Sequence, residues 1–232
     1  MMRFAALATA RCAVTLASVV QAAPPPNDVE MTTCGQVVPR KALGYLTDDL
    51  DCTGFTGGPA NINAPDAGAA VYLEKKSRLD LRGFTIKGGQ HAVGCDALVC
   101  RNNPPCSKGP CEVFNGTLEA TAPYGRGISG QRPIIHDVTI SSFWMGVVGF
   151  SRLLLSNATV ENSASTGVMG RGLSLSNVSV IASGQFGVDA YSDAGAVLRL
   201  TNSTVTGSGT AALCDTSFSL KTLTSWNICA LD

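Results

Sequence analysis

A short sequence pattern that recurs along most of the chain limits the possible folds more than any other feature. Its form is L-x-L-x-N-x-[ST]-V, and the clearest copy reads SRLLLSNATV at 151–160. The pattern returns at intervals of 20 to 32 residues. Copies of differing clarity lie at 78–86, 112–118, 133–140, 151–160, 171–180, 197–205 and 218–225.

A second element, Gly followed by Val or Ile, lies between copies of the first. It occurs four times, at steps of 19, 21 and 20 residues. Apolar and polar residues alternate in both elements and β-branched residues are frequent, which favours strands over helices. Each repeat is therefore expected to hold three short strands, beginning at Gly-Val, at L-x-L and at x-[ST]-V. The pairs are Gly127-Ile128, Gly146-Val147, Gly167-Val168 and Gly187-Val188.

A unit of about 20 residues with three short strands cannot bury its own apolar face. If successive units coil, each strand pairs with the equivalent strand of the next turn, and the sheets are parallel. The sequence therefore predicts an all-β fold, a single-stranded parallel β-helix of about seven turns and about 30 Å in length. Its interior would hold Leu153, Leu155, Leu173, Leu175, Leu198 and Leu200.

The Asn position of the pattern fits a corner between two strands. A sharp corner needs a residue that tolerates positive φ, and Asn, Asp and Gly tolerate it best. Stacked Asn side chains can also form a hydrogen-bonded ladder along the column. The repeat explains why four Asn-x-[ST] sequences recur in register, so we do not expect them to be glycosylation sites. The corner residues are Gly83, Asn115, Asp137, Asn157, Asn177, Asn202 and Thr222.

These repeats resemble the right-handed parallel β-helix of the pectate-lyase-like superfamily. The resemblance covers 71–225, and it is nearest to small secreted β-helix-repeat proteins whose first turn is similar to LDLRGFTIKGG at 79–89. It implies the fold but not the chemistry, because this superfamily includes lyases, hydrolases, epimerases, phage tailspikes and surface proteins without catalysis.

The N-terminal residues have the organisation of a secretory signal. Arg3 and Arg11 form a positive n-region, and CAVTLASVV at 12–20 is an uncharged run far shorter than a membrane-spanning helix needs. We expect a signal peptide at 1–22 and a Pro-rich leader at 23–33. The mature chain would then be secreted, periplasmic or on the cell surface, with no membrane span.

Cysteines support an oxidising compartment. Eight of the nine cysteines remain after signal removal, and an even number predicts disulfides. We expect an N-terminal cap and the first strands at 34–70, the parallel β-helix at 71–225 and a C-terminal cap at 226–232. Local pairing would pin both caps and would staple an insertion at 94–111. Zinc binding by the four middle cysteines is the alternative. The three groups are Cys34 and Cys52, then Cys95, Cys100, Cys106 and Cys111, then Cys214 and Cys229.

The Gly-Val strands are the predicted place for a substrate groove, because enzymes of the resembled superfamily use the first strand of each turn. Strand alternation predicts an outward row of Ser129, Val148, Met169 and Asp189, followed by a row of Gln131, Phe150, Arg171 and Tyr191, with Asp215 extending it. Phe150, Gln131 and Asp215 would bind sugar, Arg171 would pair with a uronate, and Asp189 or Tyr191 would act as base.

Three functions remain open. The first is a secreted, carbohydrate-associated binding or structural role without catalysis. The second is a polysaccharide lyase or C5-epimerase acting on a uronic-acid polymer, with calcium as the only cofactor considered and only for a lyase. The third is an oligomeric adhesin or tailspike-like module, since oligomeric state is not encoded in these patterns. Equal numbers of basic and acidic residues, 17 of each, give no net positive charge for nucleic acid.

Two further groups of residues, the histidines and an acidic run, are expected to have structural roles. The two histidines, His91 and His136, are expected to be ordinary surface residues. The acidic run Asp48, Asp49 and Asp51 is expected to form a solvated turn near the N-terminal cap and not a calcium site.

Overall fold

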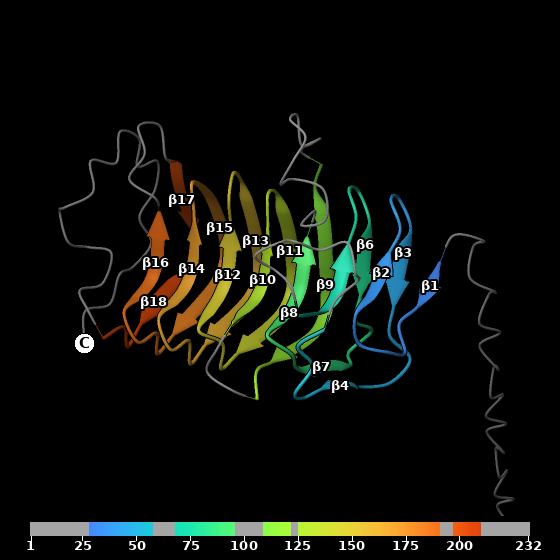
Figure 1. Cartoon of the computed structure of the whole chain (residues 1–232). Coiled ribbons are helices and arrows are strands. Elements are labelled where there is room, and N and C mark those ends of the chain that lie inside the picture. Colours follow the sequence, from blue (N-terminus) through green and yellow to red (C-terminus); the bar gives the residue numbers. More distant parts are fainter. Residues whose placement is uncertain (1–27, 58–67, 96–108, 122–124, 191–196, 210–232) are drawn as a thin grey trace, which may run out of the picture.

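The computed structural model describes residues 28–57, 68–95, 109–121, 125–190 and 197–209, and this part of the chain contains eighteen strands and no helix. The strands form two parallel sheets (Figure 1). The seven-stranded one, called here the short-strand sheet, contains β2 (Gln36–Val38), β5 (Ala69–Leu73), β8 (His91–Cys95), β10 (Arg126–Gly130), β12 (Met145–Gly149), β14 (Thr166–Gly170) and β16 (Phe186–Ala190).

The eleven-stranded sheet is called here the long-strand sheet. Its strands pair in the order β1-β3-β6-β9-β11-β13-β15-β17, with β4, β7 and β18 beside this path. They are β1 (Val29–Glu30), β3 (Leu43–Tyr45), β4 (Leu50–Cys52), β6 (Arg78–Asp80), β7 (Thr85–Gly88), β9 (Cys111–Glu119), β11 (Pro133–Ser141), β13 (Leu153–Glu161), β15 (Gly172–Ile181), β17 (Val197–Thr201) and β18 (Thr204–Thr206).

The chain alternates between the two sheets, and each strand pairs with the equivalent strand one turn later (Figure 1). Arg126 pairs with Met145, Met145 with Thr166, and Thr166 with Phe186, which are the predicted steps of 19, 21 and 20 residues. The predicted all-β, single-stranded parallel β-helix is confirmed, with the right-handed crossovers that parallel strands almost always take. Strands β2 to β4 already pair in parallel with β5 to β7, so the coil begins within the predicted N-terminal cap.

The number of strands per turn differs from the expected three. In β9, β11, β13 and β15 the L-x-L and [ST]-V segments form one strand of nine or ten residues. Pairing to the next turn resumes directly after a single corner residue, as in the register of β11 with β9, which passes from His136 to Val138. The corner therefore bends the strand without ending it.

The corner residues have the backbone conformation that their type predicts. Their φ angles are 86° at Gly83, 61° at Asn115, 56° at Asp137, 48° at Asn157, 55° at Asn177 and 46° at Asn202, whereas Thr222 lies outside the described residues. A second corner with positive φ, which the repeat pattern did not predict, follows the long strands at Ser142, Asn162, Ala182 and Gly207.

Side-chain hydrogen bonds join the corner residues of successive turns. Asn157 Nδ2 donates to Asp137 Oδ1 at 3.2 Å, and Asn177 Nδ2 donates to Asn157 Oδ1 at 3.1 Å. Asn115 Nδ2 donates to Asp80 Oδ1 at 3.3 Å, because the preceding corner residue, Gly83, has no side chain. The predicted ladder is thus present over three consecutive turns.

Two substitutions at Asn157 separate the backbone and side-chain contributions of this corner. Asn157→Gly keeps positive φ accessible and loses the ladder bonds, so we expect about 1 kcal/mol of destabilisation. Asn157→Ala also forces a residue with a Cβ into the left-handed region, which adds about 1–2 kcal/mol. Urea denaturation of both variants measures the difference, and equal stabilities would show that positive φ is not required there.

The interior is built from two sets of stacked aliphatic side chains. Ile128, Val147, Val168 and Val188 of the short-strand sheet are at most 1% exposed, which confirms that they point inward. The predicted leucines of the long-strand sheet belong to the same hydrophobic cluster. These are Leu153, Leu155, Leu173, Leu175, Leu198 and Leu200.

Glycines stand where adjacent turns approach most closely. A Cβ on Gly167 would lie 2.5 Å from Val180 Cγ1 and 2.6 Å from the carbonyl oxygen of Gly187. Gly146 is confined in the same way by Val160 and Gly167. The Gly of each Gly-Val pair is therefore fixed by packing between turns.

Two disulfides lie in the described part of the chain, Cys34–Cys52 and Cys95–Cys111. Both join cysteines of one predicted group, as local pairing requires. The second bond removes two of the four thiolates that the zinc alternative needs. The remaining predicted disulfide cysteines, Cys100, Cys106, Cys214 and Cys229, lie outside the described residues. Among the described residues, no helix is long and apolar enough to span a membrane.

Candidate functional site

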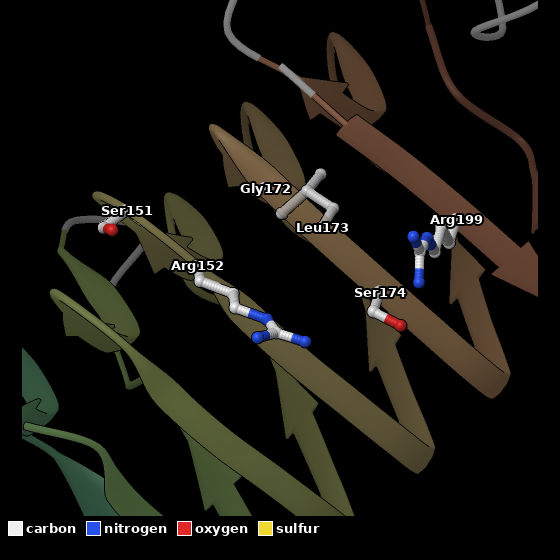
Figure 2. A pocket seen from close by; sticks show the side chains of 6 residues that line it. All are labelled: Ser151, Arg152, Gly172, Leu173, Ser174 and Arg199. Atoms are coloured by element: carbon white, nitrogen blue, oxygen red, sulfur yellow. The ribbon is translucent and has the colours of Figure 1, made fainter. Parts of the chain in front are cut away.

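A hollow of the described surface lies on the outer face of the long-strand sheet. It has a volume of about 380 Å³ and is called here the arginine hollow. Figure 2 shows the Ser174 hydroxyl between Arg152 and Arg199, with both guanidinium groups on the same side of the sheet. Its lining residues are Ser151, Arg152, Gly172, Leu173, Ser174 and Arg199.

Strand alternation and register place these side chains together. Leu173 pairs with Leu198, and both are buried, so the residues next to them, Ser174 and Arg199, point outward. Ser174 and Arg199 are themselves cross-strand partners. Arg152 directly precedes buried Leu153 at the start of β13, so its side chain reaches the same face from the preceding turn.

A second hollow, of about 210 Å³, adjoins the first through Arg152, which lines both. Its other lining residues are Pro110, Arg132, Pro133, Ile134 and Leu154. Ile134 and Leu154 are cross-strand partners and form an apolar floor. Together the two hollows combine apolar surface with three guanidinium groups on one outer face.

No ion pair within the described part of the chain involves Arg132, Arg152 or Arg199. Pro133 follows Arg132 and Leu153 follows Arg152, and β11 pairs in parallel with β13, so these arginines occupy equivalent positions in adjacent turns. Adjacent strands are about 4.8 Å apart, and like charges at that spacing repel. An anion placed between the guanidinium groups would relieve this repulsion and accept bidentate hydrogen bonds.

An ionic network lies on the same face, two turns nearer the N-terminus. Arg78 Nε donates to Glu112 Oε2. His136 Nε2 lies 3.0 Å from Glu112 Oε1, and His136 Nδ1 lies 2.7 Å from Asp137 Oδ2. The His136 ring also stacks on Phe114, with ring centroids 5.1 Å apart. Asp137 is the first residue of the ladder described above, so the network and the ladder are continuous.

The network shifts the pKa of three of its members. Burial opposes the charged form of His136, but hydrogen bonds to Asp137 and Glu112 outweigh it and raise its pKa. Burial also opposes ionisation of Glu112, but hydrogen bonds with Arg78 and His136 outweigh it and lower its pKa. The hydrogen bonds of His136 and Asn157 lower the pKa of Asp137.

These shifts predict a pH-dependent stability that His136→Gln should remove. Because the pKa of His136 is raised in the folded state, its contribution is complete below the ordinary histidine pKa and is lost as pH rises through the higher folded value. We expect the loss to be about 1 kcal/mol or less, since a quarter of the side chain is exposed. Denaturation at about pH 5 and pH 9 measures it. A wild-type advantage over His136→Gln that is larger at the higher pH would contradict the assignment.

The structure aligns the predicted outward row of the short-strand sheet. Ser129 pairs with Val148, Val148 with Met169, and Met169 with Asp189. Ser129 and Val148 are at most 1% exposed, whereas Met169 and Asp189 are half-buried. Burial raises the pKa of Asp189. This row is therefore closed to solvent over its first half.

The second predicted row lies at the end of the same sheet. Gln131, Phe150 and Arg171 follow the paired residues Gly130, Gly149 and Gly170 in successive turns. Phe150 is half-buried, with the Arg126 guanidinium 5.6 Å from its ring centroid, and Arg171 is exposed directly before Gly172 of the arginine hollow. Tyr191 and Asp215 lie outside the described residues, so the full set of predicted residues is not brought together here.

The sequence analysis did not identify the residues of the two hollows. The signal was present, because Arg199 stands between the two leucines of an L-x-L segment and Arg152 stands directly before another. His136, expected to be an ordinary surface residue, joins two carboxylates. His91 is buried, with Nδ1 accepting a hydrogen bond of 3.0 Å from the Arg126 amide. Comparison with protein-family models, curated proteins and solved structures found no match.

Proposed function

We propose that this chain is an extracellular, non-catalytic binding protein for an acidic polysaccharide, which it contacts at the arginine hollow. The observation that carries the proposal is the pair Arg152 and Arg199, which flank Ser174 without a described carboxylate partner. Guanidinium groups match the geometry of carboxylate and sulfate groups, and the apolar floor beside them suits the carbon face of a sugar ring.

Two further features support this reading. Guanidinium groups stay protonated at physiological pH, so the charged side chains of the arginine hollow are suited to binding and not to proton transfer. The predicted signal peptide and the two disulfides fit an oxidising compartment outside the cytoplasm, where polysaccharides are found.

The test uses the mature protein and trigalacturonate, a short sugar chain with one carboxylate per residue. We expect Arg152→Gln and Arg199→Gln each to weaken binding about tenfold to a hundredfold in calorimetry, because each removes a charged hydrogen bond. Lys87→Gln is the matched control, since it removes one exposed positive charge from β7. Maltotriose, a neutral trisaccharide, should not bind. Binding that survives both arginine variants would contradict the proposal.

A lyase or epimerase remains the alternative, and the raised pKa of Asp189 is the observation that favours it. A carboxyl group that is half-buried and holds its proton more tightly can act as a general acid or base. Under this alternative, polygalacturonate or alginate incubated with the protein, with and without calcium, would change in length or in uronate configuration. Asp189→Asn would abolish that change, and so would Arg171→Ala.

A further inference from the structure

Basic side chains gather along one corner of the coil, where each turn passes from the short-strand sheet to the long-strand sheet. Nine of the twelve described Lys and Arg residues lie there, and only Arg82, Lys87 and Arg126 lie elsewhere. This set is called here the basic ridge. It consists of Arg40, Lys41, Lys75, Lys76, Arg78, Arg132, Arg152, Arg171 and Arg199.

Strand register lines these residues up along the axis. Leu43 pairs with Arg78 and Arg78 with Glu112, so Lys41, Lys76 and Pro110, each two residues earlier, are equivalent in three successive turns. Cys111 pairs with Pro133, and Pro133 is equivalent to Leu153, which continues the line through Arg132 to Arg152. Arg199 lies two turns beyond Arg152. At about 4.8 Å per turn, Lys41 and Arg199 are separated by about 30 Å along the axis.

The ridge is exposed, and within the described part of the chain it has few negatively charged contacts. Seven of its nine members are exposed, and Lys75 and Arg132 are partly exposed. Two described carboxylates have polar contacts with it: Glu74 Oε2 accepts from the Arg40 amide at 2.8 Å, and Glu112 pairs with Arg78. Five other carboxylates lie away from the ridge, either after the Asn corner of a long strand, in β4, or in the turn before β4. They are Asp48, Asp49, Asp51, Glu119 and Glu161. These five carboxylates are therefore separated by position from the basic ridge.

We infer that the basic ridge binds a linear polyanionic glycan that runs parallel to the coil axis and contacts several turns at once. The arginine hollow is then one subsite of a longer track, and the choice of an acidic glycan rests on the proposed function. A row of cations that recurs in every described turn except that of Pro110 matches a polymer whose charges also repeat along a line. Simultaneous contacts raise affinity beyond that of any single subsite, and ionic contacts weaken as salt rises.

The experiment compares trigalacturonate with decagalacturonate on the full mature protein. The decamer is expected to bind at least tenfold more tightly than the trimer, with a steeper loss of affinity as salt increases. Lys41→Gln/Lys76→Gln, at the end of the ridge away from the hollow, should weaken decamer binding about tenfold and leave trimer binding unchanged. The single variants Lys76→Gln and Lys87→Gln form the matched pair, and only the first should affect the decamer.

The outcomes separate the two proposals. If the trimer binds at the arginine hollow and the decamer binds no more tightly, the ridge is not a track and the proposed function stands. If the trimer does not bind and decamer binding depends on Lys41 and Lys76, the proposal for the basic ridge is supported. The proposal that the arginine hollow is the main binding site is then contradicted. Tighter binding of single-stranded DNA with the same number of charges would overturn the glycan as ligand. Decamer binding that is unaffected by Lys41→Gln/Lys76→Gln would overturn the ridge itself.

Discussion

Leu155→Ala is expected to lower the free energy of unfolding by about 2–5 kcal/mol, while Leu154→Ala lowers it by less than about 1 kcal/mol. The two leucines are adjacent in β13, but Leu155 is 1% exposed in the interior whereas Leu154 lines the outer hollow beside Arg152. Truncating Leu155 leaves a cavity between the side chains of the turns before and after it. Parallel pairing prevents that cavity from closing, because Leu155 pairs directly with Ile135 and Leu175.

Urea denaturation of both variants, followed by circular dichroism, measures the difference. Leu154→Ala serves as the matched control because it removes the same atoms from the opposite face of the same strand. A larger loss for Leu154→Ala would mean that β13 is shifted by one residue, since such a shift exchanges inward and outward side chains.

Gly167→Ala is expected to lower the free energy of unfolding by about 3 kcal/mol, at the upper end of what overpacking usually costs. The added methyl group would meet Val180 Cγ1 at 2.5 Å, and the carbonyl oxygen of Gly187 at 2.6 Å. The valine can rotate, but the oxygen belongs to a strand that is hydrogen-bonded in place. Relief therefore requires the two turns to separate.

Gly172→Ala is the matched control for this prediction. Its Cβ would lie 3.2 Å from the nearest atom, the carbonyl oxygen of Ser151, so the change should stay within about 1 kcal/mol of wild type. Thermal denaturation of the two variants side by side measures the contrast. Equal stability would show that the contact between β14 and β16 is looser than this packing implies.

The fold could be predicted from the sequence because one repeated pattern contains both the corner residues and the core residues. Asn157 and Asn177 recur with the leucines before them, so one pattern fixes the register, the inward face and the ladder together. The joining of two expected strands into one could not be predicted in this way. It depends on pairing between the strands of adjacent turns, which is present both before and after Asp137 and Asn157.

The candidate site could be predicted less well, for physical reasons that concern particular residues. Alternation identifies Ser129 and Val148 as outward but does not reveal that both are buried. The neutral net charge gives no sign of the aligned basic residues Lys41, Lys76, Arg132 and Arg152. Their spacing in the sequence gives none either, because the steps between successive turns vary from 20 to 35 residues. His136 meets Glu112 through a contact 24 residues apart, which requires the register of β9 and β11 to be known.

The variable lengths of the connections between the two sheets have a consequence for engineering. One residue separates β14 from β15 and two separate β10 from β11, yet fifteen separate β8 from β9, whose ends Cys95 and Cys111 are joined by a disulfide. In all three turns, the strands before and after the connection pair with the equivalent strands of the adjacent turns in the same register. A peptide grafted between Gly130 and Pro133, with a cysteine at each end, should therefore be displayed on the coil without displacing the strands that flank it.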